Sequence, residues 1–167
     1  MKTFNTAVLS VTVSILDFFY RGRDFQRFWV LETIARAPYF AFLSVLHFKE
    51  SLGLRAEAHF HLMKEHFAQT VNETEHLTEM ELRGGADRWV DRFLAYHLVL
   101  IYYWIMVVYY FLAPISAYHI NELVEWHAMD TYAKYLCDHP NDLEICQIMN
   151  DEVQHAQELH KAMEMLK

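Results

Sequence analysis

Two Glu-x-x-His pairs are the residues whose types and spacing point most directly to chemistry. Glu73 and His76 form the first pair, and Glu152 and His155 form the second. Residues three apart in a helix lie on one face about one turn apart, so each pair places a carboxylate beside an imidazole. One such pair arises easily by chance in a chain with 11 histidines and 22 acidic residues. The prediction therefore depends on which helices carry the two pairs.

Two further glutamates are candidates to complete a metal centre. Two Glu-x-x-His pairs, with one lone glutamate from each of two other helices, are the ligands of a ferritin-like di-iron bundle. Glu32 lies in the apolar segment 28–34, and Glu125 lies in the segment 123–128. Buried acids are rare unless they are paired or bound to a metal. An ordinary ion pair is the alternative for each, for example between Glu32 and Arg36 one helical turn later.

The donor atoms also indicate which metal such a centre would hold. Carboxylate oxygens with one imidazole per ion suit iron or manganese, and the lack of thiolate ligands argues against structural zinc. Four carboxylates balance the charge of two Fe(II) ions, so the reduced centre is neutral in a core of low dielectric constant. Without metal, some of the four carboxylates would have to hold protons. These features predict a redox site in the bundle core.

Six helices are predicted to position these residues. Glycine and proline are scarce, with 4 and 3 residues, which leaves little turn chemistry for a β fold. The helical patterns are interrupted at 21–24, Gly53, Gly84-Gly85, Pro114 and 138–142. We therefore predict helices over residues 5–20, 25–52, 55–82, 87–113, 115–136 and 143–166. The predicted fold class is all-α, a ferritin-like four-helix di-iron bundle with additional membrane-contacting helices, in a single domain spanning residues 1–167.

One long uncharged stretch raises the question of a membrane. Residues 93–121 contain no Asp, Glu, Lys or Arg. Their wholly apolar part, 98–113, is shorter than the roughly 20 residues that a transmembrane helix needs, and its tyrosines and tryptophan are typical of a membrane interface. We therefore predict a helix that lies on the membrane with its other face on the bundle core; burial of the whole helix in the core is the alternative. Residues 5–20 predict a second membrane-contacting helix rather than a signal peptide.

Composition narrows the classes of partner. The net charge of −8 argues against a nucleic-acid partner. A hydrophobic content of 54%, with 16% aromatic residues, is high for a soluble protein and indicates contact with lipid. The two cysteines, Cys137 and Cys146, have neither a zinc nor a thioredoxin-like spacing. They are interpreted as reduced structural thiols.

Four segments of the chain resemble the motifs of the alternative oxidases, especially their plastid terminal oxidase branch. The run LETIARAPYF at 31–40 resembles the family's "LET" region, and NETEHL at 72–77 resembles its "NERMHL" motif. The run VEWHA at 124–128, with the following Thr131-Tyr132, is similar to the plastid form of the "LEEEA" region. DEVQH at 151–155 matches the core of "RADEAHH". The four segments follow the family's order and are specific jointly.

The resemblance implies a function and a site. It implies a membrane-bound quinol:oxygen oxidoreductase, with a single di-iron oxidase domain that reduces O2 to water without pumping protons. It implies two Fe ions as cofactor, held by six ligands: Glu32, Glu73, His76, Glu125, Glu152 and His155. It places the quinol pocket on Arg27, Leu31 and Thr131, and the family's essential tyrosine on Tyr132. Asn72 and Asp151 match residues that the family uses beside the ligands, where hydrogen bonds to His76 and His155 are expected.

The resemblance also implies partners and a location. The substrates would be O2 and a quinol, either plastoquinol or ubiquinol. The protein would be monotopic on a prokaryotic cytoplasmic or thylakoid-type membrane, and a homodimer is compatible with this reading.

The chain departs from the family pattern in three places. The connection between Lys134 and Glu152 is much shorter than in the plant members. His127 stands where the mitochondrial branch has a third glutamate, and Met149-Asn150 replaces the first residues of "RADEAHH". The short connection bears on pocket shape, oligomer contacts and substrate choice more than on the metal centre.

Two other functions are compatible with the same residues. A soluble di-iron oxidase, such as a ferroxidase or hydroxylase, would use the same ligands, but the uncharged aromatic stretch 93–121 disfavours it. A non-enzymatic, membrane-associated bundle would use the Glu-His pairs structurally, and bound iron would exclude it.

Overall fold

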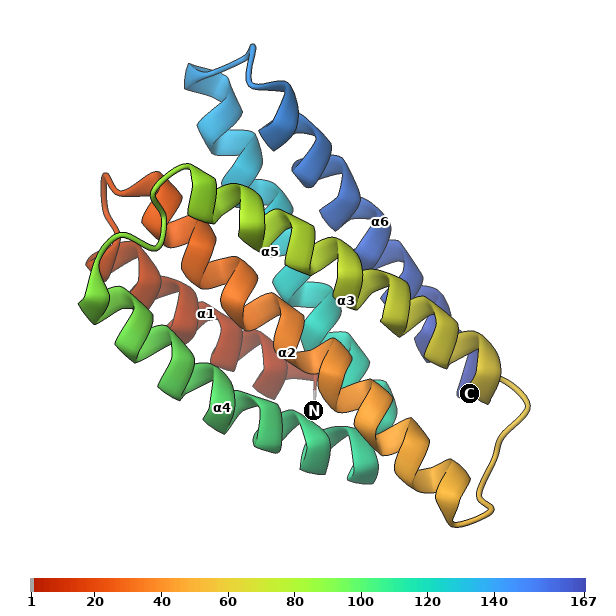
Figure 1. The fold of residues 1–167 in the computed structure, drawn as a ribbon. Coiled ribbons are helices and arrows are strands. Elements are labelled where there is room, and N and C mark those ends of the chain that lie inside the picture. Colours follow the sequence, from red (N-terminus) through yellow and green to blue (C-terminus); the bar gives the residue numbers. More distant parts are fainter. Residues whose placement is uncertain (1) are drawn as a thin grey trace.

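A computed structural model describes residues 2–167, and within that range it contains six α-helices and no strand (Figure 1). Met1, the first residue of the predicted domain, lies outside the described range. The all-α fold class and the number of helices are confirmed, and the predicted bounds differ by at most four residues, at the start of the third helix. The helices are α1 Lys2–Phe19, α2 Asp24–Ser51, α3 His59–Leu82, α4 Trp89–Leu112, α5 Pro114–Asp138 and α6 Leu143–Met165.

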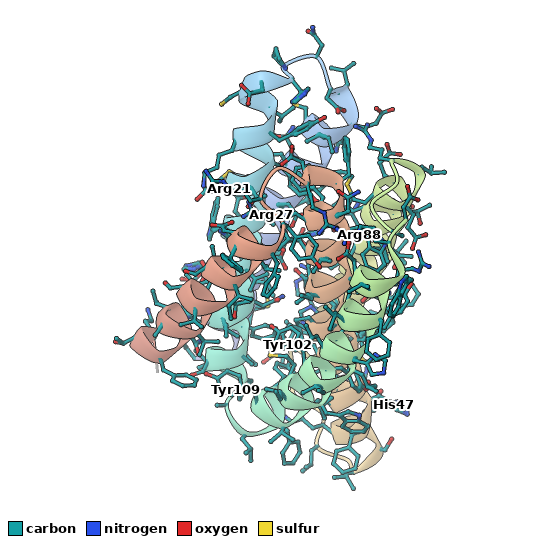
Figure 2. The ribbon with its side chains drawn as sticks, turned by 90° about the vertical axis from the view of Figure 1, so that its left-hand side faces the viewer. Arg21, Arg27, His47, Arg88, Tyr102 and Tyr109 are labelled. Atoms are coloured by element: carbon teal, nitrogen blue, oxygen red, sulfur yellow. The ribbon has the colours of Figure 1, made fainter. Side chains whose placement is uncertain are left out.

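Four of the helices form the bundle that carries the predicted ligands. α2 packs against α3, and α5 packs against α6; contacts of α2 with α5 and of α3 with α6 close the bundle. The two remaining helices lie outside it, α4 along α2 and α1 along α5. Figure 1 shows α1 and α4 on one side of the bundle, away from α6, and Figure 2 looks onto this side. The arrangement matches the predicted bundle with two additional helices.

Apolar layers enclose the middle of the bundle. We call them the Trp29 cluster and the Phe42 cluster, after their central residues. The first contains Phe28, Trp29, Leu77, Met80, Tyr132, Ile145 and Ile148. The second contains Tyr39, Phe42, Leu46, Leu62, Met106, Tyr118 and Leu159. Along each bundle helix the predicted ligands fall between residues of the two clusters, so both clusters exclude water from the layer that holds the acids.

The turn between α3 and α4 depends on Gly85. A Cβ atom at this position would lie 2.5 Å from the backbone oxygen of Phe25 and 2.7 Å from Cβ of Trp29. A larger residue would therefore push the turn away from α2. Close packing at this point fixes how α2 and α3 lie relative to each other.

An ion-pair cluster fastens the end of α3 to the turn between α5 and α6. Arg83 donates to both carboxylate oxygens of Asp142, at 2.5 and 3.1 Å. Asp142 also caps α6, because its side chain accepts from the backbone N–H of Ile145. The hydrogen bond from Arg83 lowers the pKa of Asp142. This contact holds the two helix pairs together at one end of the bundle.

Two helices are long and apolar enough to cross a membrane by length and composition, but they differ in burial. In α2, 72% of the apolar window is buried inside the protein, whereas in α4 the buried share is 17%. α4 packs on the bundle through Ala95, Met106 and Tyr110. The alternative of an α4 wholly buried in the core is therefore wrong. The rest of its surface exposes large apolar side chains, among them Leu98, Leu100, Ile101, Trp104, Ile105 and Val108.

Candidate metal centre

All six side chains predicted as ligands meet in the polar layer of the bundle. Glu32 comes from α2 and Glu125 from α5, while α3 and α6 each supply a Glu-x-x-His pair. None of the six is more than 4% exposed. One donor atom from each member of two overlapping groups lies within 4.8 Å of the others. The groups are Glu32, Glu73, His76 and Glu152, and Glu73, Glu125, Glu152 and His155.

The two groups have the same composition and share two residues. Glu73 and Glu152 belong to both, and each group adds one lone glutamate and one histidine. This is the arrangement of two adjoining four-ligand sites related by an approximate two-fold axis through the bundle. It arises because two helix pairs, α2–α3 and α5–α6, each contribute one lone glutamate and one Glu-x-x-His pair.

Eight buried atoms in this layer, six carboxylate oxygens and two imidazole nitrogens, have no hydrogen-bond partner. Buried polar atoms nearly always have one, so eight such atoms in a single cluster fit the ligands of a bound cation. His155 Nδ1 lies 2.9 Å from Glu73 Oε1, and His76 Nδ1 lies 3.3 Å from Glu152 Oε1; neither contact has hydrogen-bond geometry. Two ligands of one ion approach each other in this way. The orphans are both oxygens of Glu73 and of Glu152, Oε2 of Glu32 and of Glu125, and Nδ1 of His76 and of His155.

The remaining atoms of these side chains are held by neighbours. Asp151 Oδ2 accepts from His76 Nε2 at 3.1 Å and from Asn72 Nδ2 at 3.4 Å. This bond aims Nδ1 of His76 into the cluster, as expected for a residue that orients a metal-binding histidine. A similar hydrogen bond was expected for His155. Within residues 2–167, however, Asp151 bonds to His76 and Asn72, and neither Asp151 nor Asn72 bonds to His155. The two helix pairs are therefore not equivalent in how their histidines are held.

Electrostatics make the cluster costly without a cation. Burial raises the pKa of Glu73 and of Glu152 well above that of an ordinary carboxyl group, and the charges of neighbouring glutamates raise both further. Burial alone lowers the pKa of His76, but the nearby carboxylates of Glu32 and Glu73 and the hydrogen bond to Asp151 outweigh it and raise that pKa to about 9. Burial lowers the pKa of His155. Protons must therefore neutralise the cluster where cations do not.

Arg27 and Thr131, two of the three residues predicted for the quinol pocket, lie close together. Arg27 Nη2 lies 3.5 Å from Thr131 Oγ1 and 2.7 Å from Oδ1 of Asp17 on α1. Leu31 belongs to the Trp29 cluster, as does Tyr132. The Tyr132 hydroxyl donates to Glu32 Oε1. Figure 2 shows Arg27 near Arg21, where α1 turns into α2, on the face formed by α1 and α4.

The structure also adds two residues and rules out one pairing. Tyr39, on α2, donates its hydroxyl to Glu125 Oε1 at 2.7 Å, and Asp17 pairs with Arg27; the sequence reasoning proposed neither contact. The spacing of Tyr39 from Glu32 repeats that of Tyr132 from Glu125, which was the available signal. The alternative of an ion pair between Glu32 and Arg36 is wrong, because Glu32 turns to Tyr132 and His76 instead.

Comparisons with known proteins identify the family. A family model described as "Alternative oxidase" matches residues 8–147. The chain is 49% identical over 132 residues to ubiquinol oxidase 4, chloroplastic/chromoplastic, of Arabidopsis thaliana. That match covers 79% of this chain and 37% of the relative, so the chain spans little more than a third of the relative's length. No solved structure matches the chain. The family match and the shared identity show that this chain belongs to the alternative oxidase family.

Proposed function

We propose that this chain is a membrane-bound quinol oxidase that reduces O2 to water at a di-iron centre without pumping protons. The observation that carries the proposal is the set of eight orphaned donor atoms on four glutamates and two histidines, enclosed between two apolar clusters. Membership of the alternative oxidase family supports the oxidase chemistry, and the matched relative is named a ubiquinol oxidase.

The donor set fits two Fe ions. Glu73 and Glu152, with both oxygens of each unpartnered, would be shared between the ions. Glu32 and His76 would complete one site, and Glu125 and His155 would complete the other, although the family match ends before the last pair of ligands. When bound, two iron ions supply electrons to O2 and are reduced again by quinol. Four carboxylates would neutralise two Fe(II) ions and remove the need for the bound protons.

Residues on the α1 side of the cluster would bind the quinol. An open hollow of about 580 Å³ lies beside Arg27 at the turn between α1 and α2. Asp17 holds the guanidinium of Arg27 against Thr131, where hydrogen bonds to a quinol oxygen can form. A quinol in the membrane would enter laterally between α1 and α4.

Tyr132 would connect the quinol pocket with the metal centre. It follows Thr131 directly and is fully buried. Its hydroxyl proton lies in the hydrogen bond to Glu32 Oε1, which orients Glu32 Oε2 towards the cluster. A phenol at this place, between substrate and ligand, is suited to pass single electrons while its proton stays on the Tyr132–Glu32 pair.

The outer surface of α1 and α4 would contact the membrane interface. Exposed side chains of α4 include Trp104, Ile105 and Val108, and those of α1 include Val11 and Phe18. Contiguous exposed apolar surface of this kind marks an interaction site, and a helix with one packed and one apolar exposed face suits the plane of the interface. A soluble ferroxidase or hydroxylase would have no use for this surface.

Oxygen uptake tests the proposal directly. Membranes that contain the protein, given quinol in the presence of cyanide, should consume oxygen, and the purified protein should contain about two iron ions per chain. Protein without bound iron would contradict the metal centre. Protein with iron that partitions into the aqueous phase without detergent, and leaves quinol unoxidised, would instead support the soluble di-iron oxidase.

A further inference from the structure

A second tyrosine repeats the relation of Tyr132 to the metal cluster. Tyr39 follows Glu32 by seven residues, and Tyr132 follows Glu125 by seven residues, which in a helix is two turns on the same face. Each tyrosine hydroxyl donates to the lone glutamate of the other helix, Tyr132 to Glu32 and Tyr39 to Glu125. The approximate two-fold axis that relates the ligands therefore also relates these two tyrosines.

Tyr39 is enclosed in the Phe42 cluster, on the side of the metal layer opposite the Trp29 cluster. It is fully buried, and its ring lies 5.9 Å from that of His155 and 6.0 Å from that of His66, between centroids. A phenylalanine would fill this apolar space equally well. Burial of the hydroxyl is favourable only because Glu125 accepts its hydrogen bond. The phenol oxygen is thus a feature of the metal layer, whereas the ring belongs to the apolar packing.

We propose that Tyr39 is a positioning residue for the Glu125–His155 half of the centre. Its hydrogen bond occupies Glu125 Oε1 and leaves the orphaned Oε2 as the one oxygen of this side chain that is free for an ion. Tyr132 does the same for Glu32, whose Oε2 is the orphan. Each lone glutamate thereby presents a single oxygen, while Glu73 and Glu152 keep both. The inference rests on the metal centre proposed above.

The two tyrosines differ in what lies beyond them. Tyr132 adjoins Thr131 and the predicted quinol pocket, whereas Tyr39 faces His66, Phe42 and the interior of the Phe42 cluster. Loss of the Tyr39 hydroxyl should therefore change metal binding without changing the KM for quinol. Loss of the Tyr132 hydroxyl should change both.

Stepwise titration of the metal-depleted protein with Co(II), followed by visible absorption, tests the assignment. In Tyr39→Phe one of the two binding steps should weaken about tenfold, as for other residues that orient metal ligands, and the other step should stay unchanged. In the double variant with Tyr132→Phe both steps should weaken. Tyr39→Phe keeps the ring and its packing, so helix content by circular dichroism should equal that of the wild type.

Tyr118→Phe is the matched control. Tyr118 is also a fully buried tyrosine of the Phe42 cluster, but its hydroxyl bonds to His66 and Tyr110 and contacts no predicted ligand. Both Co(II) steps should be as in the wild type. Unchanged binding in Tyr39→Phe, equal weakening of both steps, or the same effect in the control would overturn the assignment.

The titration also separates this inference from the proposed function. Wild-type protein that binds two Co(II) ions, with one step sensitive to Tyr39→Phe, supports the inference even if no quinol is oxidised. Wild-type protein that binds two ions, with neither step sensitive, rejects the role of Tyr39 and leaves the oxidase proposal standing. Wild-type protein that binds no ion rejects both.

Discussion

The interior of the four-helix bundle and the outer face of α4 depart from the usual distribution of residues in opposite directions. Soluble proteins bury apolar side chains and expose charged ones, so a buried charge or a large exposed apolar face is the informative observation. Here the middle of the bundle holds four glutamates that are 0 or 1% exposed, while Trp104 and Ile105 on α4 are 60% and 55% exposed.

Each of the two regions therefore needs a component from outside the chain. Buried carboxylates that raise one another's pKa require cations or protons, and an exposed apolar face requires lipid or another apolar surface. The two needs are independent, since the ligands lie on α2, α3, α5 and α6, whereas most of the exposed apolar face lies on α1 and α4. Substitutions in one region should therefore leave the property of the other intact, and the following predictions test that separation.

The largest effect is expected from removal of a ligand. Glu73→Ala or His155→Ala should lower quinol oxidation by more than about a hundredfold, because loss of a ligand exceeds the effect of losing a residue that merely orients one. Bound iron should fall together with activity, as measured by metal analysis and oxygen uptake. Membrane binding should be unchanged. Oxygen uptake like that of the wild type in either variant would refute the ligand assignment.

A large effect on location is expected from charges on α4. The triple variant Ile101→Glu, Ile105→Glu and Val108→Glu should weaken binding to lipid vesicles by more than about a thousandfold, since each buried aliphatic side chain contributes about 1.5–3 kcal/mol. Flotation with vesicles measures the change, and iron content should stay constant.

Leu143→Glu is the control for the α4 variant, because Leu143 is also exposed but lies at the start of α6, away from α4. It should float as the wild type does. Equal loss of flotation in the control, or retention in the triple variant, would show that α4 is not the membrane surface.

The metal-free protein should show an unusual dependence of stability on pH. Burial raises the pKa of Glu152 well above its usual value, so the folded state keeps a proton that the unfolded state loses above about pH 4.5. Stability should therefore fall as pH rises, by about 1.4 kcal/mol per pH unit for one proton, until the folded pKa is reached. Addition of Fe(II) should remove this loss.

Glu152→Gln separates this effect from the other titrations of the chain. Glutamine resembles the protonated acid, so with a chelator present the variant should match the wild type near pH 4 and be more stable than the wild type at pH 8. Urea unfolding at several pH values measures the difference. A difference that does not grow with pH would contradict the predicted raised pKa of the buried carboxyl.

The smallest effect is expected outside both regions. Arg83→Ala removes the bidentate bond to Asp142 and weakens the cap of α6. A hydrogen bond to a charged group contributes about 1.5–3 kcal/mol, and the cap is weakened rather than removed, so the free energy of unfolding should fall by about 2 kcal/mol. Urea unfolding measures the loss, while iron content and flotation should be those of the wild type. A loss of iron would mean that the ion pair between Arg83 and Asp142 supports the metal ligands directly.

Most of the fold could be predicted from local sequence patterns. Scarce glycine and proline mark the helix breaks, and helical periodicity depends on neighbouring residues alone, so the six helices were predictable within a few residues. The Glu-x-x-His pairs were predictable for the same reason, because one helical turn is a local distance. Glu32 and Glu125 were harder, since an ion pair such as Glu32 with Arg36 has an equally good local spacing, and only burial distinguishes a ligand from a surface acid.

Residue spacing along the chain was enough to predict which helices form, which face of each carries the acids, and which family the motifs resemble. The packing of the helices was needed to show that Glu73 and Glu152 belong to both ligand groups, that Asp151 supports His76, and that Tyr39 bonds to Glu125. Each of these contacts joins residues of different helices. Their geometry depends on how the helices pack and rotate against one another, and residue spacing along a single helix does not contain that information.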